Sequence, residues 1–363
     1  MVALPEGRRW TLALVFGGRS PEHEVSLVSA RAIFEHLDKD RYEIVLVGID
    51  RQGQVRVGDE SFFAGSMDQG AGRVVRWPAS PKDGFLRDEA SGEAVTPPID
   101  VFFPIVHGAG GEDGTLQGVF SLAGIPFVGA GVLGTSAAMD KDVARRLLAA
   151  EGLATVADAV FDTLELPDAE SVLPVIRSLG WPVFVKPARA GSSLGISKVD
   201  SPADLASALA TAHAVDSKIV VERAVPNARE IEVAVLGDDE PRVSRPGEII
   251  PGAEFYDYDA KYRNADSKLL IPAPIADSLA EHCREMALRA FRALDLSGMA
   301  RVDFLLPGDG GRPLVNEVNT HPGFTSISMY PKLWEAEGLS FAEVLDHLID
   351  SAFRKNASGP LRP

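Results

Sequence analysis

Near its start the sequence has an apolar run, residues 12–16, which is followed by two glycines and then by a helix pattern. The stretch from Leu12 to Leu37 is "LALVFGGRSPEHEVSLVSARAIFEHL". Ser20 is a good helix N-cap, Pro21 suits the first helical turn, and the acidic residues after it favour the positive end of a helix. A strand, a glycine turn and a helix in this order start an α/β unit built on a parallel sheet.

The chain is long enough for several packed units. It has 363 residues, of which 45% are hydrophobic and 24% charged, the values of an ordinary soluble globular protein. No run approaches the ~18 apolar residues of a transmembrane helix. The start, "MVALPEGRRW", has no apolar core of signal-peptide length. These features predict a cytoplasmic protein without a membrane partner.

Charge and cysteine content exclude two further classes. The net charge of −16 opposes binding to a phosphate backbone, so no nucleic-acid partner is expected. Cys283 is the one cysteine, which rules out an intramolecular disulfide and a Cys-rich metal site. Its helical surroundings, "EHCREMALRAF", indicate a buried inert thiol. Any anionic ligand must then be held by a few individually placed basic residues.

Three units are expected along the chain. The first, residues 1–131, is an N-terminal α/β domain with further strands at 42–50, 100–108 and 125–129. Its segment 51–98 is rich in Gly, Ser, Pro and Asp, which predicts loops with short strands.

The second unit, residues 132–225, has a helix at 139–152 and a strand–loop–strand pattern at 181–199. The third unit, residues 226–363, starts with the strand "EIEVAVLG". The overall prediction is an α/β fold of three domains.

A hairpin in the third unit carries clustered polar residues. The strands "ARVDFLL" and "LVNEVN" flank the turn "PGDGG". Alternate residues of a strand share a face, so Asp303 is expected opposite Glu317, with Asn319 on the same face. Three oxygen ligands of this kind suit Mg²⁺, and Arg301 adds a positive charge for a phosphate or an oxyanion. The alternative is a strand whose polar side chains only meet water.

A second motif indicates a nucleotide. In "VFVKPARAGSSLG", Lys186 ends a strand and a loop of glycine and serine follows, whose backbone N–H groups can cradle phosphates. The order of a Walker A loop is absent. Lys141, near the start of its helix, is another phosphate-binding candidate. The alternatives are an ordinary turn with a snorkelling lysine and a surface charge.

Residues 252–273, "GAEFYDYDAKYRNADSKLLIPA", are polar and aromatic with little periodicity. Tyr256, Tyr258 and Tyr262 are three of the five tyrosines in the chain. The composition predicts a lid that closes over substrates and excludes water. A surface loop without function is the alternative.

Taken together, these motifs resemble the ATP-grasp superfamily, and within it the D-alanine–D-alanine ligase family. The resemblance covers nearly the whole chain, with seven segments in the expected order. They are "GGRSPEHEVS", "HGAGGEDGTLQG", "MDK", "VKPARAGSSLG", "EFYDYDAKY", "ARVDF" and "NEVNTHPGFTS".

The resemblance implies a three-domain ATP-grasp fold whose N-terminal domain is a Rossmann-like parallel-sheet unit. It implies ATP-dependent ligation of two D-alanine molecules to D-alanyl-D-alanine, through an acyl phosphate, for peptidoglycan precursor synthesis. ATP would be the co-substrate, two Mg²⁺ ions the cofactors, with Mn²⁺ able to substitute, and a homodimer the assembly by analogy.

Roles follow from the resemblance residue by residue. ATP would be bound by Lys141, Lys186, Ser192, Ser193, Glu222, Val225 and Glu230. The two metal ions would be held by Asp303, Glu317 and Asn319.

Glu22 would bind the ammonium of the first D-alanine, in a hydrogen-bonded set with Ser192 and Tyr262. Arg301 and the backbone N–H of Gly323 would stabilise the oxyanion. The second D-alanine would meet Ser328, Lys261 and His107.

One position departs from the family pattern: His321 stands where relatives usually have Met or Ser. The stretch "ERAVPNARE" is also one residue longer than in some relatives.

The motifs bear on four alternative functions. An ATP-grasp enzyme for another acid, such as a biotin-dependent carboxylase subunit, is disfavoured by the Glu22 motif and the lid. A D-alanine–D-lactate ligase is closer, but its lid carries an imidazole where this chain has Tyr262. A non-catalytic nucleotide-binding regulator would lack a metal ligand. A Rossmann dehydrogenase needs a Gly-x-Gly-x-x-Gly fingerprint, which "VFGGRSPEHE" lacks.

Overall fold

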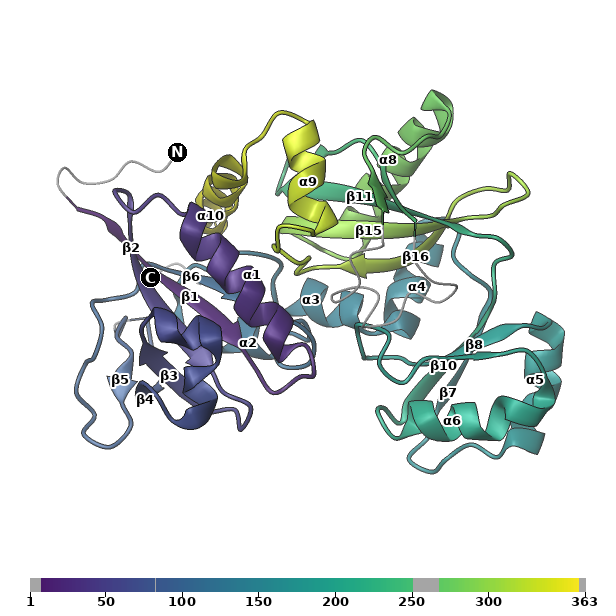
Figure 1. The fold of residues 1–363 in the computed structure, drawn as a ribbon, viewed down its shortest axis with the longest axis horizontal. Helices are drawn as coiled ribbons and strands as arrows, with labels where there is room; N and C mark the ends of the chain where they lie inside the picture. Colours follow the sequence, from purple (N-terminus) through teal and green to yellow (C-terminus); the bar gives the residue numbers. More distant parts are fainter. Residues whose placement is uncertain (1–7, 82, 251–267, 359–363) are drawn as a thin grey trace.

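The structure is a computed structural model that describes residues 8–81, 83–250 and 268–358. Three β-sheets organise it (Figure 1). We call them sheets A, D and C in chain order. In the view of Figure 1 sheet A lies at the left, sheet D at the lower right and sheet C at the upper right. Within the described ranges, no helix is long and apolar enough to cross a membrane.

Sheet A is parallel at its centre and antiparallel at one edge. Its strand order is β5-β4-β3-β2-β1-β6, and β1 pairs in parallel with both β2 and β6. The strands are β1 (Trp10–Gly17), β2 (Tyr42–Ile49), β3 (Val55–Gly58), β4 (Arg73–Arg76), β5 (Arg87–Asp88) and β6 (Val101–Ile105). The predicted parallel sheet and the short strands within 51–98 are confirmed. The predicted strand at 125–129 is wrong, because only an isolated bridge forms there, between Phe102 and Phe127.

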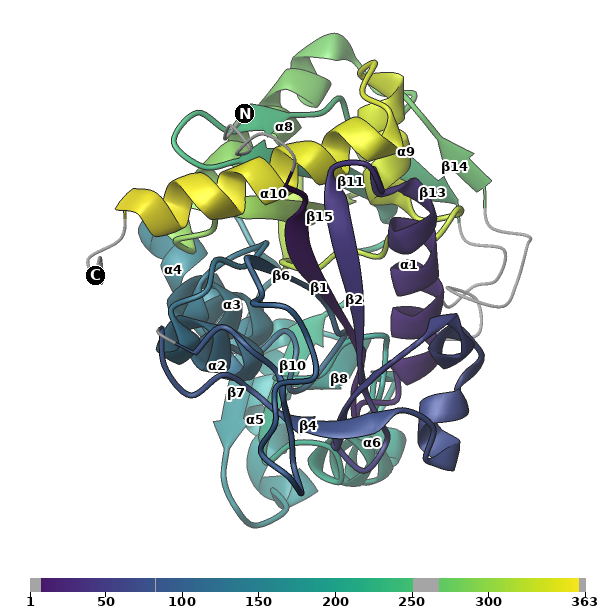
Figure 2. The ribbon, with the colours of Figure 1, turned by 90° about the vertical axis from the view of Figure 1, so that its left-hand side faces the viewer.

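Helices cover both faces of sheet A. Leu12, Leu14 and Phe16 of β1 belong to a core that includes α1 (His23–His36) and α10 (Phe341–Ser358). Ala13 and Val15 point the other way, into a core with α2 (Thr115–Ala123). This alternation explains why β1 reads as a continuous apolar run. The C-terminal helix α10 thereby joins the N-terminal sheet, as Figure 2 shows.

Sheet D is covered by helices on one face. Its order is β7-β10-β8-β9, with bounds β7 (Asp158–Asp162), β8 (Val183–Pro187), β9 (Ser197–Val199) and β10 (Lys218–Arg223). Val183, Val185 and Val221 pack with α5 (Ala169–Leu179) and α6 (Leu205–His213). By alternation, Lys186 and Glu222 lie on the opposite face. The strand–loop–strand prediction for 181–199 is confirmed, whereas β7 was not foreseen.

Sheet C has one apolar face and one mixed face. Its order is β14-β13-β11-β15-β16, with β12 paired to β11. The bounds are β11 (Arg229–Gly237), β12 (Arg242–Val243), β13 (Gly247–Ile250), β14 (Lys268–Leu270), β15 (Gly298–Leu306) and β16 (Leu314–Asn319). Val233, Val302 and Val318 share a core with residues of α3 (Val132–Met139), α4 (Lys141–Ala150) and α8 (Asp277–Ala293).

The other face of sheet C changes character along its strands. At one end Ala234, Leu236 and Met299 join the core that contains α9 (Met329–Ala336) and α10. At the other end the same face carries charged side chains. The candidate site lies at this charged end.

Candidate active site

The β15–β16 hairpin brings four predicted site residues together. Asp303 pairs with Glu317, and Arg301 pairs with Asn319, across antiparallel strands. Directly paired residues share a face, so one carboxylate pair, an amide and a guanidinium lie together. A register shift follows Asp303, which takes the apolar end of the hairpin out of strict alternation. The predicted pairing is confirmed.

Arg301 is held between two carboxylates. Its Nε and Nη2 donate to the two Asp303 oxygens at 2.7 and 2.6 Å, and Nε lies 3.0 Å from Glu232 Oε2. Burial alone would lower the pKa of Arg301, but Asp303 and Glu232 outweigh it and raise that pKa well above its usual value. Glu232 was missed from the sequence. It lies two residues after Glu230, so strand alternation could have found it.

The oxygen set of the hairpin fits a hard divalent cation. Asp303 and Glu317 supply carboxylates, and Asn319 Oδ1, which accepts the His321 N–H at 3.1 Å, keeps a second lone pair. Among the residues described, no group of three or more His, Cys, Asp or Glu side chains forms a metal site by itself. Such a site here therefore needs the Asn319 amide or oxygens from a ligand.

A second charged cluster lies on the face of sheet D that points away from α5 and α6. Lys186 Nζ is 2.6 Å from Glu222 Oε2, and Arg145 Nη2 donates to Glu222 Oε1 at 2.5 Å. Burial alone would raise the pKa of Glu222, but Lys186 and Arg145 outweigh it and lower that pKa to about 2. Arg145 was also missed. It lies one helical turn from Lys141 in the predicted helix, which was an available signal.

Lys141 stands between the two clusters. It is the first residue of α4, where Asp140 caps the helix by accepting the N–H groups of Asp142 and Val143. Its Nζ donates to the Ala190 carbonyl at 2.7 Å. Burial lowers the pKa of Lys141, Lys186 lowers it further, and Glu317 opposes both. Lys141 therefore interacts electrostatically with charged groups of both sheet D and sheet C.

The glycine–serine loop approaches the N-terminal unit. Ser192 and Ser193 have φ of 48° and 59°, a left-handed conformation that costs a non-glycine residue about 1–2 kcal/mol. In this conformation Ser192 Oγ donates to Glu22 Oε1. Glu22 directly precedes α1 and is 8% exposed. The predicted Glu22–Ser192 contact is present, across 170 residues of sequence.

Glu112 lies where the N-terminal unit meets sheet C. Burial raises its pKa well above the usual range, and the charges of Glu22 and Glu317 add to the effect while Arg301 opposes it. Glu112 Oε2 accepts the Gly108 N–H at 2.7 Å. The segment "HGAGGEDG" belongs to the family pattern, but the pattern alone does not predict a role for the Glu112 carboxylate.

His107 lies in a buried polar network beside the site. Its Nε2 is 3.3 Å from Ser29 Oγ, which in turn accepts the Phe324 N–H at 3.3 Å. Burial lowers the pKa of His107 to about 4, although a hydrogen bond with the His321 backbone opposes the shift. Burial also lowers the pKa of His321 to about 3. Both imidazoles are therefore neutral near pH 7.

The remaining predicted residues are spread around this centre. Gly323 lies against Ser328, because a Cβ on Gly323 would be 2.9 Å from Ser328 Oγ. Val225 lies in the link between β10 and β11, and Glu230 shares a strand face with Glu232. Lys261, Tyr262 and most of the predicted lid lie outside the described residues.

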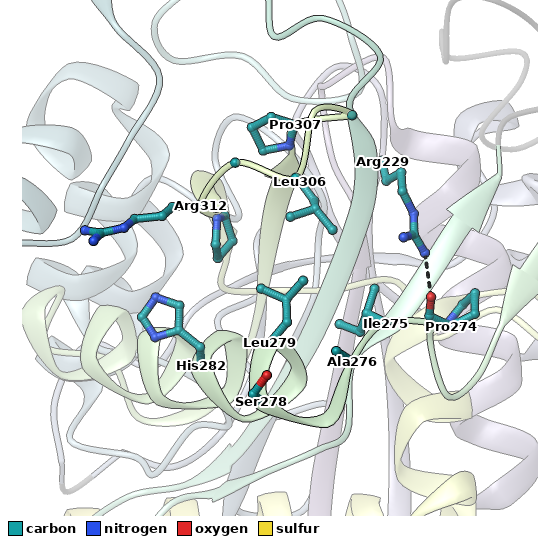
Figure 3. A pocket seen from close by; sticks show the side chains of 14 residues that line it. Arg229, Pro274, Ile275, Ala276, Ser278, Leu279, His282, Leu306, Pro307 and Arg312 are labelled. Atoms are coloured by element: carbon teal, nitrogen blue, oxygen red, sulfur yellow. Dashed lines mark hydrogen bonds between the residues drawn. The ribbon is translucent and has the colours of Figure 1, made fainter.

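A pocket of about 860 Å³ lies elsewhere, between the start of α8 and the turn of the β15–β16 hairpin (Figure 3). Arg229 at its rim binds both Glu248 oxygens, at 2.7 and 2.8 Å, and the Pro274 carbonyl. Since Arg229 and Glu230 are neighbours on one strand, their side chains point to opposite faces. This pocket is therefore separate from the charged face.

The three-sheet arrangement is an ATP-grasp fold, and solved structures of similar chains share it. The D-Ala:D-Ser ligase VanG from Enterococcus faecalis superposes with a TM-score of 0.84 at 36% identity, covering 95% of this chain and 100% of that one. The D-alanine-D-alanine ligase from Coxiella burnetii gives 0.83 at 33% identity, covering 96% and 95%.

Sequence comparison identifies the family. The family described as D-ala D-ala ligase N-terminus matches residues 11–130, and D-ala D-ala ligase C-terminus matches residues 147–350. The D-alanine--D-alanine ligase of Heliobacterium modesticaldum is 48% identical over 345 residues, 94% of this chain and 93% of that protein. D-alanine--D-alanine ligase A of Escherichia coli is 44% identical over 357 residues, 96% of each. The chain belongs to the D-alanine–D-alanine ligase family.

Proposed function

We propose that this chain joins two D-alanine molecules into D-alanyl-D-alanine at the expense of ATP, for peptidoglycan precursor synthesis. The observation that carries the proposal is the convergence of charges at Glu112. Its carboxylate interacts electrostatically with Glu22, at the start of α1, and with Glu317 and Arg301 on sheet C. An acid for an ammonium and a guanidinium for an oxyanion thus lie within one enclosure.

The chemistry requires activation of a carboxylate. An amide does not form readily from a free carboxylate, because the leaving group would be oxide. The first D-alanine carboxylate would attack the γ-phosphorus of ATP, releasing ADP and forming an acyl phosphate. The amine of the second D-alanine would then attack the acyl carbon and expel phosphate, losing one proton.

Each charged group has a role in this sequence. Glu22, oriented by Ser192, would bind the ammonium of the first substrate. Lys141 and Lys186 would hold the ATP phosphates, with Ser193, Val225 and Glu230 completing the nucleotide site. Arg301 and the Gly323 N–H would stabilise the oxyanion, where aligned donors are most effective.

Asp303, Glu317 and Asn319 would hold two Mg²⁺ ions, or Mn²⁺ in their place. The ions would offset the repulsion between the ATP phosphates and the attacking carboxylate. Ser328, Lys261 and His107 would receive the second D-alanine. Near pH 7 the neutral His107 can hydrogen-bond without repelling an ammonium.

We further propose a division into domains 1–131, 132–225 and 226–363, with the segment 252–273 as a lid and a homodimer as the assembly. The link at 224–228 between β10 and β11 supports the second boundary, because it joins two separate sheets.

Phosphate release tests the activity. With ATP and Mg²⁺, D-alanine should stimulate release strongly, whereas L-alanine and no amino acid should not. Equal stimulation by L-alanine would contradict the proposal, because Glu22 and Arg301 would then not be positioning a D-configured substrate.

The product is tested by competition among acceptors. When D-alanine, D-lactate and D-serine compete at equal concentration near pH 7, the dipeptide D-alanyl-D-alanine should dominate. The phenol of Tyr262 is neutral at this pH and does not oppose an incoming ammonium. Tyr262→His should shift product toward the D-lactate ester, more so at lower pH, where an imidazole is charged. Dominant ester or D-serine product from the unmodified chain would overturn this assignment.

A further inference from the structure

The carboxylate of Glu222 already has a cation on each oxygen. Lys186 forms an ion pair with Oε2 and Arg145 forms one with Oε1. The Glu222 side chain is 2% exposed. Each oxygen of this carboxylate thus accepts one charged donor inside the protein and keeps a second lone pair for a ligand. Its contacts also fix the position of the Lys186 ammonium.

Arg145 reaches this cluster from a different part of the fold. It belongs to α4, whose Ala144 and Leu148 pack in the core of sheet C. Glu222 and Asp158 lie directly opposite each other on β10 and β7 of sheet D. Arg145 bridges both, with Nη1 donating to Asp158 Oδ2 at 3.0 Å. The guanidinium therefore connects α4, which packs on sheet C, to the face of sheet D that points away from α5 and α6.

Stability alone is a poor reason for such a cluster. A buried ion pair contributes little relative to apolar residues of the same volume, because both charges lose their hydration. The Arg145 side chain is 6% exposed, and its Nε has no hydrogen-bond acceptor among the residues described. The arrangement does, however, set the direction of charged groups accurately, which phosphate binding requires.

We propose that Arg145 is a positioning residue for the nucleotide, acting through Glu222 to aim Lys186 at the phosphates and to hold sheet D against α4. The inference rests on the proposed function for the identity of the ligand. Arg145 and Lys141 lie one turn apart on α4, so one helix both supplies a phosphate-binding lysine and orients a second one on the facing sheet.

Nucleotide binding by Arg145→Met tests the proposal. The dissociation constant of a non-hydrolysable ATP analogue with Mg²⁺ should rise about tenfold, while the KM for D-alanine changes less than about twofold. Arg146→Met is the matched control. Its side chain is 69% exposed and pairs with Asp142 at the surface, so its nucleotide affinity should equal that of the unmodified chain. An equal loss in both variants, or none in Arg145→Met, would overturn the proposal.

A double-mutant cycle tests whether Arg145 acts through Glu222. In a Glu222→Gln background, Arg145→Met should weaken binding by less than about twofold further, because the link it serves is already broken. A full tenfold additional loss would mean that Arg145 acts by another route.

Arg145→Lys keeps a cation and the packing but cannot bridge two carboxylates as a planar fork does. It should give an intermediate affinity, which keeps the proposal testable if the Met variant does not fold. Unmodified affinity in Arg145→Lys, or a loss in D-alanine KM equal to that for ATP, would refute it.

The binding assay contains no amino acid, so it separates the two proposals. If the unmodified chain binds the analogue but forms no dipeptide, the proposed function fails while the inference about Arg145 can still be confirmed.

Discussion

Sheets D and C each carry a buried charged cluster, and the two differ in charge balance. On sheet D, Glu222 and Asp158 face Lys186 and Arg145, so two acids meet two bases. On sheet C, three acids surround one base in a set made of Glu232, Asp303, Glu317 and Arg301. Lys141 adds one positive charge from α4, and the cluster on sheet C still has a net negative charge.

The difference indicates what each cluster is for. A balanced cluster is complete without a ligand and serves to orient its members. A cluster with excess carboxylates is stabilised by cations from outside, and hard oxygens select Mg²⁺ or Mn²⁺ for that place. The same substitution, Glu to Gln, should therefore mainly lower activity on sheet C and mainly lower stability on sheet D.

The largest expected effect is on catalysis, in Glu317→Gln. The substitution is nearly isosteric but removes a charged metal ligand, so ligation should fall at least about 100-fold. Thermal stability should change little, with Tm within about 2 °C, because repulsion from Glu112 and Asp303 is relieved while attraction to Lys141 and Arg301 is lost. Phosphate release and a melting curve measure the two quantities. Near-normal turnover would remove Glu317 from the metal site.

The second effect is on stability, in Glu222→Gln. Here two buried cations lose their shared counter-charge, and breaking a buried pair costs about 3–5 kcal/mol. We expect Tm to fall by roughly 5–10 °C, with a smaller loss of activity than in Glu317→Gln. Glu317→Gln should thus lose more activity than Glu222→Gln, and Glu222→Gln should lose more stability than Glu317→Gln. A Tm unchanged in Glu222→Gln would contradict the balanced cluster.

The smallest effect is on the pH dependence of stability. The pKa of Glu222 is about 2 in the folded protein, against an ordinary value of 4.5. Because the unfolded chain binds the proton more readily, this contribution is complete above pH 4.5 and is lost as the pH falls toward 2. Between about pH 5 and about pH 3, the unmodified chain should lose up to about 1.4 kcal/mol per pH unit more than Glu222→Gln. Urea unfolding at several pH values measures the slope, and parallel slopes would refute the depressed pKa.

Local sequence patterns predicted much of the fold because their causes are local. The pleat of a strand places Asp303 opposite Glu317 once the turn is located, and the glycines after β1 predict the entry into α1. The strand expected at 125–129 did not form. Its apolar residues Ile125 and Val128 are buried between helices and sheet edge, and burial alone does not distinguish a strand from an extended loop.

The sequence by itself determined which residue types lie on each strand face and at each helix start, since periods of 2.0 and 3.6 are properties of the backbone. Only the tertiary structure decided the partners. Ser192 meets Glu22 across 170 residues, and Phe324 meets Ser29 across 295. Arg145 donates to Glu222 because α4 packs on sheet C while the Arg145 guanidinium reaches sheet D. Contacts of this kind depend on how separate sheets pack together, which no local period encodes.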